Sequence, residues 1–248
     1  MPLASFANWS EFAMTDDLQA FYGRWARLYD RIARFPGVGA WRAAAADALA
    51  LEPGDTVLEM GCGTGANLPY LRERVGPEGQ VIGIDLTAGM LDVARERVER
   101  RGWKNVSLIR ADASRPPIAA SAVDHAIGEG TNGKGIDAVL ASFLSGMFAD
   151  PAPVIEEWCS LLGPGGRICL LDATRSADRR ALPLDMTFRA FVVASTPPTW
   201  QLRYDDPPWR ALEARVESAH DAVRRCCGTY GADRFALGFV RLTYGVVE

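Results

Sequence analysis

Short apolar runs alternate with longer amphipathic segments along the central half of this chain. The apolar runs cover residues 56–60, 80–85, 106–110, 136–140 and 167–172. Helical spacing lies between them: in 88–101, residues such as Met90 and Val98 fall on one face. Strands that alternate with helices pair in parallel through right-handed crossovers. The alternation therefore predicts an α/β fold around a doubly wound, mostly parallel sheet.

Composition narrows the classes of function. The 248 residues carry a net charge of -4 and a pI of about 5.4, which counts against a nucleic-acid partner, because such proteins usually present a basic face. Five cysteines without a CxxC pair, and only two histidines, predict neither a metal site nor a disulfide framework. The sequence shows no leader peptide and no transmembrane segment, so we expect a cytoplasmic protein. It gives no indication of an oligomeric state.

A glycine cluster follows the first apolar run directly. Residues 57–65 read VLEMGCGTG, in which Gly61, Gly63 and Gly65 separate a strand from a helix. Glycine permits positive φ and lets a ligand approach the backbone, and parallel sheets bind ligands at the carboxyl ends of their strands. The GxGxG spacing differs from the GxGxxG of dinucleotide-binding loops, and Glu59 suits a cationic ligand better than a diphosphate. The alternative is a glycine-rich turn without a ligand.

Two aspartates follow the next two apolar runs. Asp85 ends the second run, where a carboxylate can accept two hydrogen bonds from a ribose diol; alternatively it caps the helix that begins near Ala88. Asp112 follows the third run, where it can accept from an adenine amine while the N–H of Ala113 faces a ring nitrogen; alternatively it is a turn aspartate. With the glycine cluster, these positions predict a nucleoside site. The glycine spacing disfavours a nicotinamide dehydrogenase.

These segments resemble the motifs of class I S-adenosylmethionine-dependent methyltransferases. The first four motifs are similar to EMGCGTG at 59–65, IGIDLTAGMLDVARERV at 82–98, NVSLIRADA at 105–113 and IDAVLASF at 136–143, and the later turn and strand are similar to LGPGGRICLLD at 162–172. The resemblance covers about residues 20–175 and implies a Rossmann-like fold and S-adenosylmethionine as cofactor. FYGRWARLYD at 21–30 is similar to an aromatic-rich helix of ubiquinone/menaquinone C-methyltransferases and bacterial phospholipid N-methyltransferases.

The resemblance implies a role for each matching position. The residues predicted to bind the cofactor are Tyr22, Tyr29, Glu59, Gly61, Cys62, Gly63, Gly65, Asp85, Leu86, Met90, Asp112, Ala113, Ser142 and Phe143. The glycine loop and its glutamate would line the methionine part, and the aspartate after the second strand would bind the ribose. Leu86 would lie on the face of the adenine, and Asp112 and Ala113 would form hydrogen bonds with its edge. Ser142 and Phe143 would border the transferred methyl group, while the two tyrosines would close the pocket.

We predict that residues 1–248 form a single domain. Its parts are N-terminal helices at 17–50, a cofactor-binding core at 55–175, a small substrate cap at 176–235 and a last, antiparallel strand within 236–248.

Three segments within this outline have sequences that predict a turn, a helix and a long loop. Residues 163–166, GPGG, predict a tight turn, and 211–226 predict a helix inside the cap. The loop between Asp112 and Asp137 is longer than the family's pattern.

Methyl transfer from a sulfonium is an in-line displacement, so the protein mainly aligns the reactants and excludes water. We expect a small-molecule or lipid-like acceptor with a nitrogen, oxygen or carbon nucleophile. A phenol or ring carbon needs a base near its proton, and His125 and His220 are the candidates; each is alternatively an ordinary surface or core histidine. A non-catalytic S-adenosylmethionine-binding protein or a regulatory partner subunit is the alternative function.

Overall fold

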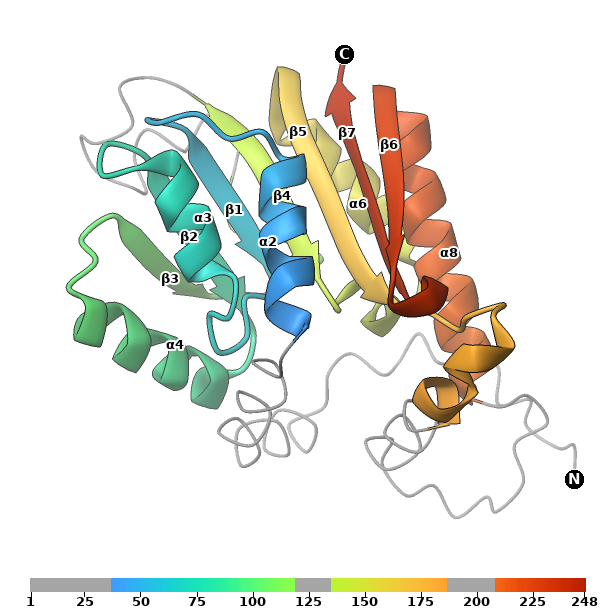
Figure 1. Ribbon diagram of the computed structural model, residues 1–248. Helices are drawn as coiled ribbons and strands as arrows, with labels where there is room; N and C mark the ends of the chain where they lie inside the picture. Colours follow the sequence, from blue (N-terminus) through green and yellow to red (C-terminus); the bar gives the residue numbers. More distant parts are fainter. Residues whose placement is uncertain (1–36, 119–134, 187–207) are drawn as a thin grey trace, which may run out of the picture.

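The computed structural model describes residues 37–118, 135–186 and 208–248. Its centre is a seven-stranded sheet with the order β3-β2-β1-β4-β5-β7-β6 (Figure 1). The strands are β1 Thr56–Met60, β2 Gln80–Asp85, β3 Val106–Arg110, β4 Ile136–Ser142, β5 Leu162–Ala173, β6 Cys227–Phe235 and β7 Val240–Val247. The pairs among β1 to β5 are parallel, whereas β7 is antiparallel to both β5 and β6. The predicted Rossmann-like, doubly wound sheet is therefore confirmed.

The order of the strands fixes where a ligand can bind. The chain runs from β1 outward to β2 and β3, and then returns to place β4 on the other side of β1. At such a reversal the loops after the two central strands diverge and leave a crevice at the carboxyl edge of the sheet. The glycine loop after β1 and the segment after β4 meet at this edge.

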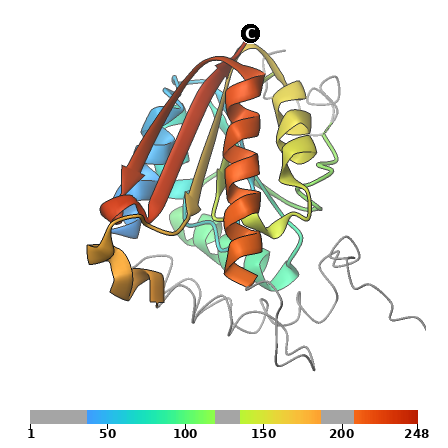
Figure 2. The same ribbon diagram turned by 90° about the vertical axis from the view of Figure 1, so that its right-hand side faces the viewer.

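Helices cover both faces of the sheet. They are α2 Val38–Ala48, α3 Leu68–Val75, α4 Ala88–Arg101, α6 Pro151–Ser160 and α8 Pro208–Cys226. Figure 1 shows α2, α3 and α4 in front of the sheet, and Figure 2 shows α6 and α8 side by side on the opposite face. Each layer has its own apolar core, one containing Leu68 and Leu71 of α3, the other Ile155 and Trp158 of α6.

Trp158 connects the helical layer to the segment after β3. Its side chain has no exposed surface, and its ring packs edge-to-face on Phe148, with 5.7 Å between the ring centroids. The indole N–H donates a hydrogen bond of 2.7 Å to the carbonyl oxygen of Ala113. A buried indole usually finds such a partner, and here the bond fixes the backbone that follows Asp112.

The structure places two segments in elements other than those expected from the sequence. Residues 208–226 and 227–235, which we assigned to the cap, form α8, packed against α6, and the edge strand β6. The predicted tight turn at 163–166 lies inside β5 as an irregularity, because Ile136 pairs with Leu162 while Ala138 pairs with Arg167. The part of the cap that precedes α8 includes the short 3-10 helix η3, Arg179–Ala181. Among the described residues, none of the helices is long and apolar enough to span a bilayer.

Candidate active site

The loop after β1 makes three turns of the backbone that only glycine adopts easily. Gly61, Gly63 and Gly65 have φ of 63°, 54° and 71°, a region that is costly for other residues. A Cβ on Gly61 would lie 2.7 Å from Leu144, and one on Gly65 would collide with Leu68. A Cβ on Gly63 would meet no atom within 4 Å. At the outer two glycines a side chain would therefore also displace a neighbouring leucine, whereas Gly63 borders open space.

Asp85, at the end of β2, lies beside this loop. One carboxylate oxygen accepts a 2.8 Å hydrogen bond from the N–H of Gly63, and the other accepts one of 2.8 Å from the N–H of Thr87, which precedes α4. Burial raises the pKa of Asp85 above its usual value, against the opposing effect of these two bonds. The carboxylate thus fixes the middle of the glycine loop and the turn that precedes α4. It does not cap the helix, whose N-cap residue is Thr87.

Glu59 is buried beneath the loop. Its side chain is 1% exposed; Oε1 accepts a 2.8 Å hydrogen bond from the side-chain amide of Asn67, whereas Oε2 has no hydrogen-bond partner among the described residues. Burial raises the pKa of Glu59 to about 7, although the Asn67 bond and the positive charge of Arg42 act in the opposite direction. A buried carboxylate with one free oxygen can accept a hydrogen bond from a cationic ligand at small further cost.

Asn67 joins three elements at this point. Besides Glu59 in β1, its Nδ2 lies 3.0 Å from Oγ of Ser142 at the end of β4, and its Oδ1 accepts a 2.8 Å bond from Arg42 in α2. The Arg42 guanidinium lies 5.3 Å from the ring centroid of Phe143, within the range of a cation–π contact. Neither Arg42 nor Asn67 was predicted from the sequence to belong to the site.

Phe143 carries an unusual backbone conformation. It has φ of 58°, although a bulky residue rarely adopts positive φ. Its N–H donates a 2.7 Å hydrogen bond to the carbonyl of Leu171 in β5, which helps to hold this conformation. The chain therefore turns sharply after Ser142, and it places Leu144 against Gly61.

The other predicted site residues differ from one another in how far they are buried. Cys62 and Met90 are 4% and 5% exposed, and burial raises the pKa of the Cys62 thiol well above its usual value. Asp112 is exposed and accepts a 2.8 Å bond from the N–H of Ser114, as a turn aspartate does, while Ala113 is buried. Leu86 is half-buried. The predicted positions Tyr22, Tyr29 and His125 lie outside the described residues.

His220 lies inside the molecule. It has no exposed surface; its Nδ1 is 2.7 Å from the hydroxyl of Thr243, and its Nε2 is 3.3 Å from Asp172. The same Asp172 oxygen accepts a 2.7 Å bond from the buried hydroxyl of Ser145, which follows β4. With both ring nitrogens engaged and no open face, His220 cannot contact an acceptor, so this geometry contradicts its direct use as a base.

A His220→Asn substitution is expected to lower stability and to leave chemistry intact. Loss of one buried hydrogen bond and of ring volume should cost about 1–3 kcal/mol, measured by urea unfolding. The rate of methyl transfer in a single turnover should stay within about twofold of the wild-type rate. A fall of about 100-fold or more, the usual contribution of a general base, would contradict the structural role.

The elevated pKa of Glu59 predicts an effect of pH on stability. Between the ordinary carboxyl value of 4.5 and about 7, the folded protein keeps a proton that the unfolded chain has lost. Stability should therefore fall by about 1–3 kcal/mol as pH rises through this window, and level off above it. Urea unfolding from about pH 5 to about pH 8 measures the slope. Glu59→Gln should flatten it; the matched control Glu73→Gln, an exposed carboxyl in α3, should not.

The arrangement fits S-adenosylmethionine in three respects. The free oxygen of Glu59 offers an acceptor for a cationic group, Gly63 leaves space against the backbone, and Asp85 supplies a carboxylate at the end of β2. These groups come from neighbouring strands and meet at the carboxyl edge of the sheet. Among the described residues, no group of three or more His, Cys, Asp or Glu side chains is placed to hold a metal ion.

Comparison with solved structures shows the same fold. A SAM-dependent methyltransferase from Aquifex aeolicus superposes with a TM-score of 0.57 at 19% identity and covers 90% of this chain and 98% of its own. Phosphoethanolamine N-methyltransferase 2 of Haemonchus contortus, solved with S-adenosylhomocysteine, superposes with a TM-score of 0.58 at 16% identity, over 88% of this chain and 45% of its own.

Sequence comparison identifies the family. Aklanonic acid methyltransferase DauC of a Streptomyces species is 29% identical over 174 residues, which are 69% of this chain and 72% of that protein. The 2-phytyl-1,4-naphthoquinone methyltransferase of Thermosynechococcus vestitus is 33% identical over 159 residues, 63% of this chain and 64% of that protein. The family model described as "Methyltransferase domain" matches residues 51–194. The chain therefore belongs to this methyltransferase family, and it is a class I S-adenosylmethionine-dependent methyltransferase.

Proposed function

We propose that the enzyme transfers the methyl group of S-adenosylmethionine to a small-molecule or lipid-like acceptor, with ring compounds of the quinone type as the first class to test. The observation that carries the proposal is the loop geometry: Gly63 borders open space and donates a hydrogen bond to the carboxylate of Asp85, and Glu59 of the preceding strand has one oxygen without a hydrogen-bond partner among the described residues. Relatives named for aklanonic acid, a phytyl naphthoquinone and demethylmenaquinone support the acceptor class.

The roles of individual residues follow from their positions. Glu59 would accept from a cationic group of the methionine part, Asp85 from the ribose, and the backbone at Gly63 would lie along the ligand. Ser142 and Phe143, at the sharp turn after β4, would border the acceptor, and Asn67 would hold Glu59 and Ser142 at a fixed separation. When bound, S-adenosylmethionine supplies a methyl group on positively charged sulfur, which a nitrogen, oxygen or carbon nucleophile displaces in line.

Rate enhancement in such a site would come from alignment and exclusion of water. The apolar segment that includes Leu144 packs on the glycine loop, and the segment after β3 is tied down through Trp158. Both keep the walls of the crevice in place while the reactants meet. A cytoplasmic location and the absence of a nucleic-acid partner remain predictions from the sequence.

Calorimetry with S-adenosylhomocysteine and with NAD tests the cofactor. We expect saturable binding of S-adenosylhomocysteine and none of NAD, because the loop has the GxGxG spacing. Formation of S-adenosylhomocysteine is then followed by mass spectrometry with S-adenosylmethionine and a panel of hydroquinones, phenols and amines. Tight binding without turnover on any acceptor would favour the non-catalytic alternative. Failure to bind the nucleoside would overturn the proposal.

A further inference from the structure

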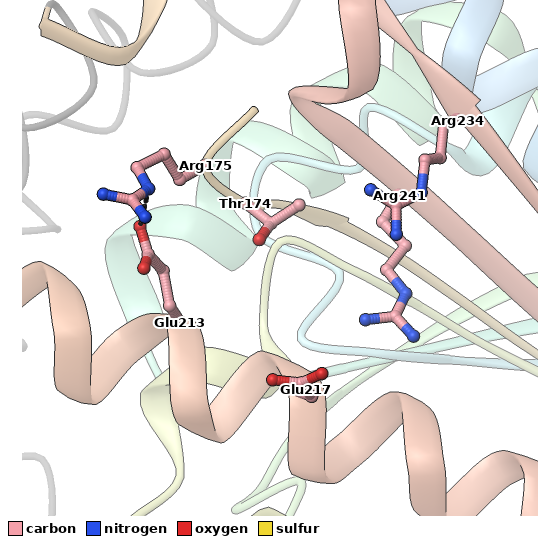
Figure 3. A pocket seen from close by; sticks show the side chains of 6 residues that line it. All are labelled: Thr174, Arg175, Glu213, Glu217, Arg234 and Arg241. Carbon is pink, nitrogen blue, oxygen red and sulfur yellow. Dashed lines mark ion pairs between the residues drawn. The ribbon is translucent and has the colours of Figure 1, made fainter. Parts of the chain in front are cut away.

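A charged cavity lies at the same edge of the sheet as the glycine loop but is built from other residues. It has a volume of about 190 Å³ and is lined by Thr174, Arg175, Glu213, Glu217, Arg234 and Arg241. These residues come from the segment after β5, from α8 and from the β6–β7 hairpin (Figure 3). The volume is roughly six times the ~30 Å³ that one water molecule occupies, which is room for a small polar group.

Arg241 is the central residue of this cavity. Its side chain is 8% exposed, yet it makes no hydrogen bond or ion pair with any described residue. Figure 3 shows its guanidinium group pointing from β7 toward α8, on the side of Glu217. Partial withdrawal of an unpaired guanidinium from water costs free energy, and an acceptor in the cavity would offset that cost.

Among the neighbours of Arg241, Arg234 adds positive charge and Glu217 adds negative charge. Arg234 lies directly opposite it in the antiparallel β6–β7 pair, so the two side chains share one face of the sheet, where like charges repel. The pKa of Arg241 is lowered first by burial and then by Arg224 and Arg234, whereas Asp221 and Glu217 oppose the shift. The third arginine of the cavity is already engaged, because Arg175 lies 3.8 Å from Glu213.

We propose that this cavity binds a carboxylate or phosphate group, with Arg241 and Arg234 as its hydrogen-bond donors. A guanidinium presents two parallel N–H groups that match the oxygens of such an anion. A bound oxyanion would also place negative charge between Arg241 and Arg234, which repel each other. It would supply the hydrogen-bond acceptor that Arg241 lacks.

The position of the cavity suggests the source of the anion. Arg241 pairs in register with Asp172, whose side chain accepts from Ser145 just after β4, and Thr174 follows the end of β5 directly. The cavity is thus next to the segments that would border the acceptor. We infer that the group is an acidic substituent of the acceptor; this second step rests on the proposed function.

Calorimetric titration with inorganic phosphate and with benzoate, at constant ionic strength, tests the site without any methyl transfer. We expect saturable binding that weakens at least about tenfold in Arg241→Gln and less in Arg234→Gln, whose exposed side chain carries little risk for folding. Arg100→Gln, on the exposed surface of α4, serves as the charge-matched control and should bind like the wild type. Equal binding by Arg241→Gln, or none by the wild type, overturns the proposal.

Two further readouts separate the possible outcomes. Phosphate or benzoate should raise the melting temperature of the wild type and not that of Arg241→Gln. The variant should bind S-adenosylhomocysteine with wild-type affinity. That result would show that the variant is folded and that the cofactor site is independent of the cavity. If benzoate binds and its uncharged analogue benzamide does not, the result supports a carboxylate group on the acceptor. Binding of phosphate alone overturns the acceptor step and leaves a site for free phosphate.

Discussion

Replacing Gly63 by valine is expected to abolish detectable binding of S-adenosylhomocysteine, a loss of at least about 100-fold. The residue has φ of 54°, and a Cβ built on it would project into open space. We assign that space to the cofactor, so the valine side chain would occupy the volume that the ligand needs. Its backbone would also be strained by about 1–2 kcal/mol, the ordinary cost of left-handed conformation for a residue with a side chain. Calorimetry measures the change directly.

Gly102→Val is the matched control. Gly102 has φ of 64°, and a Cβ there also meets nothing within 4 Å, but it ends α4. The control therefore introduces the same side chain with the same kind of strain away from the glycine loop. It should lose stability and keep its affinity. If both variants bound equally well, the glycine loop would not be the cofactor site.

The parallel strands could be predicted closely from the sequence. β1, β2 and β3 begin and end at the predicted residues, because parallel strands covered on both faces are short apolar runs bounded by turn residues. The same reasoning fails for β6. Most of its side chains are exposed, so its sequence CGTYGADRF carries no apolar run or alternation, and only pairing with β7 makes it a strand.

The acidic and glycine positions of the candidate site could also be located in the sequence, since each lies at the carboxyl end of a strand or just beyond it. Arg42 and Asn67 could not, because their importance depends on contacts between elements. Arg42 is the one charged residue between Trp41 and Asp47 in α2, which is only a weak sequence signal, and its contact with Phe143 is visible only in the structure. In the sequence Asn67 is an ordinary polar residue after the glycine cluster, and only the structure shows that it immediately precedes α3, which begins at Leu68.

His220 shows the opposite error. A histidine is a plausible base in any sequence, and nothing in the spacing of α8 reveals that this one is enclosed by Asp172 and Thr243 from two strands. Burial of a single polar residue is a tertiary property. Asp85 and Asp112 show a third case, in which a carboxylate that accepts from the backbone N–H two residues later is also the one proposed to bind the nucleoside.

Removing the Asp85 carboxylate is expected to weaken S-adenosylhomocysteine binding by about 1–3 kcal/mol, or roughly 5- to 150-fold, the range for hydrogen-bond partners left unmet. Asp85→Ala deletes the acceptor of the Gly63 and Thr87 N–H groups as well as the proposed ribose contact. Asp55→Ala is the control: Asp55 is 8% exposed and accepts a 2.8 Å bond from the N–H of Glu52 beside the start of β1. It should change stability without changing affinity.

A loss of affinity alone does not distinguish contact with the sugar from support of the loop. The 2′-deoxy analogue of S-adenosylhomocysteine makes the distinction, because it lacks one of the hydroxyls that Asp85 would bind. Wild-type protein should prefer the parent compound by about 1 kcal/mol or more, and Asp85→Ala should show little preference, since the hydroxyl then has no partner. If the preference survives the substitution unchanged, Asp85 acts only on the Gly63 backbone and the start of α4, and another residue binds the ribose.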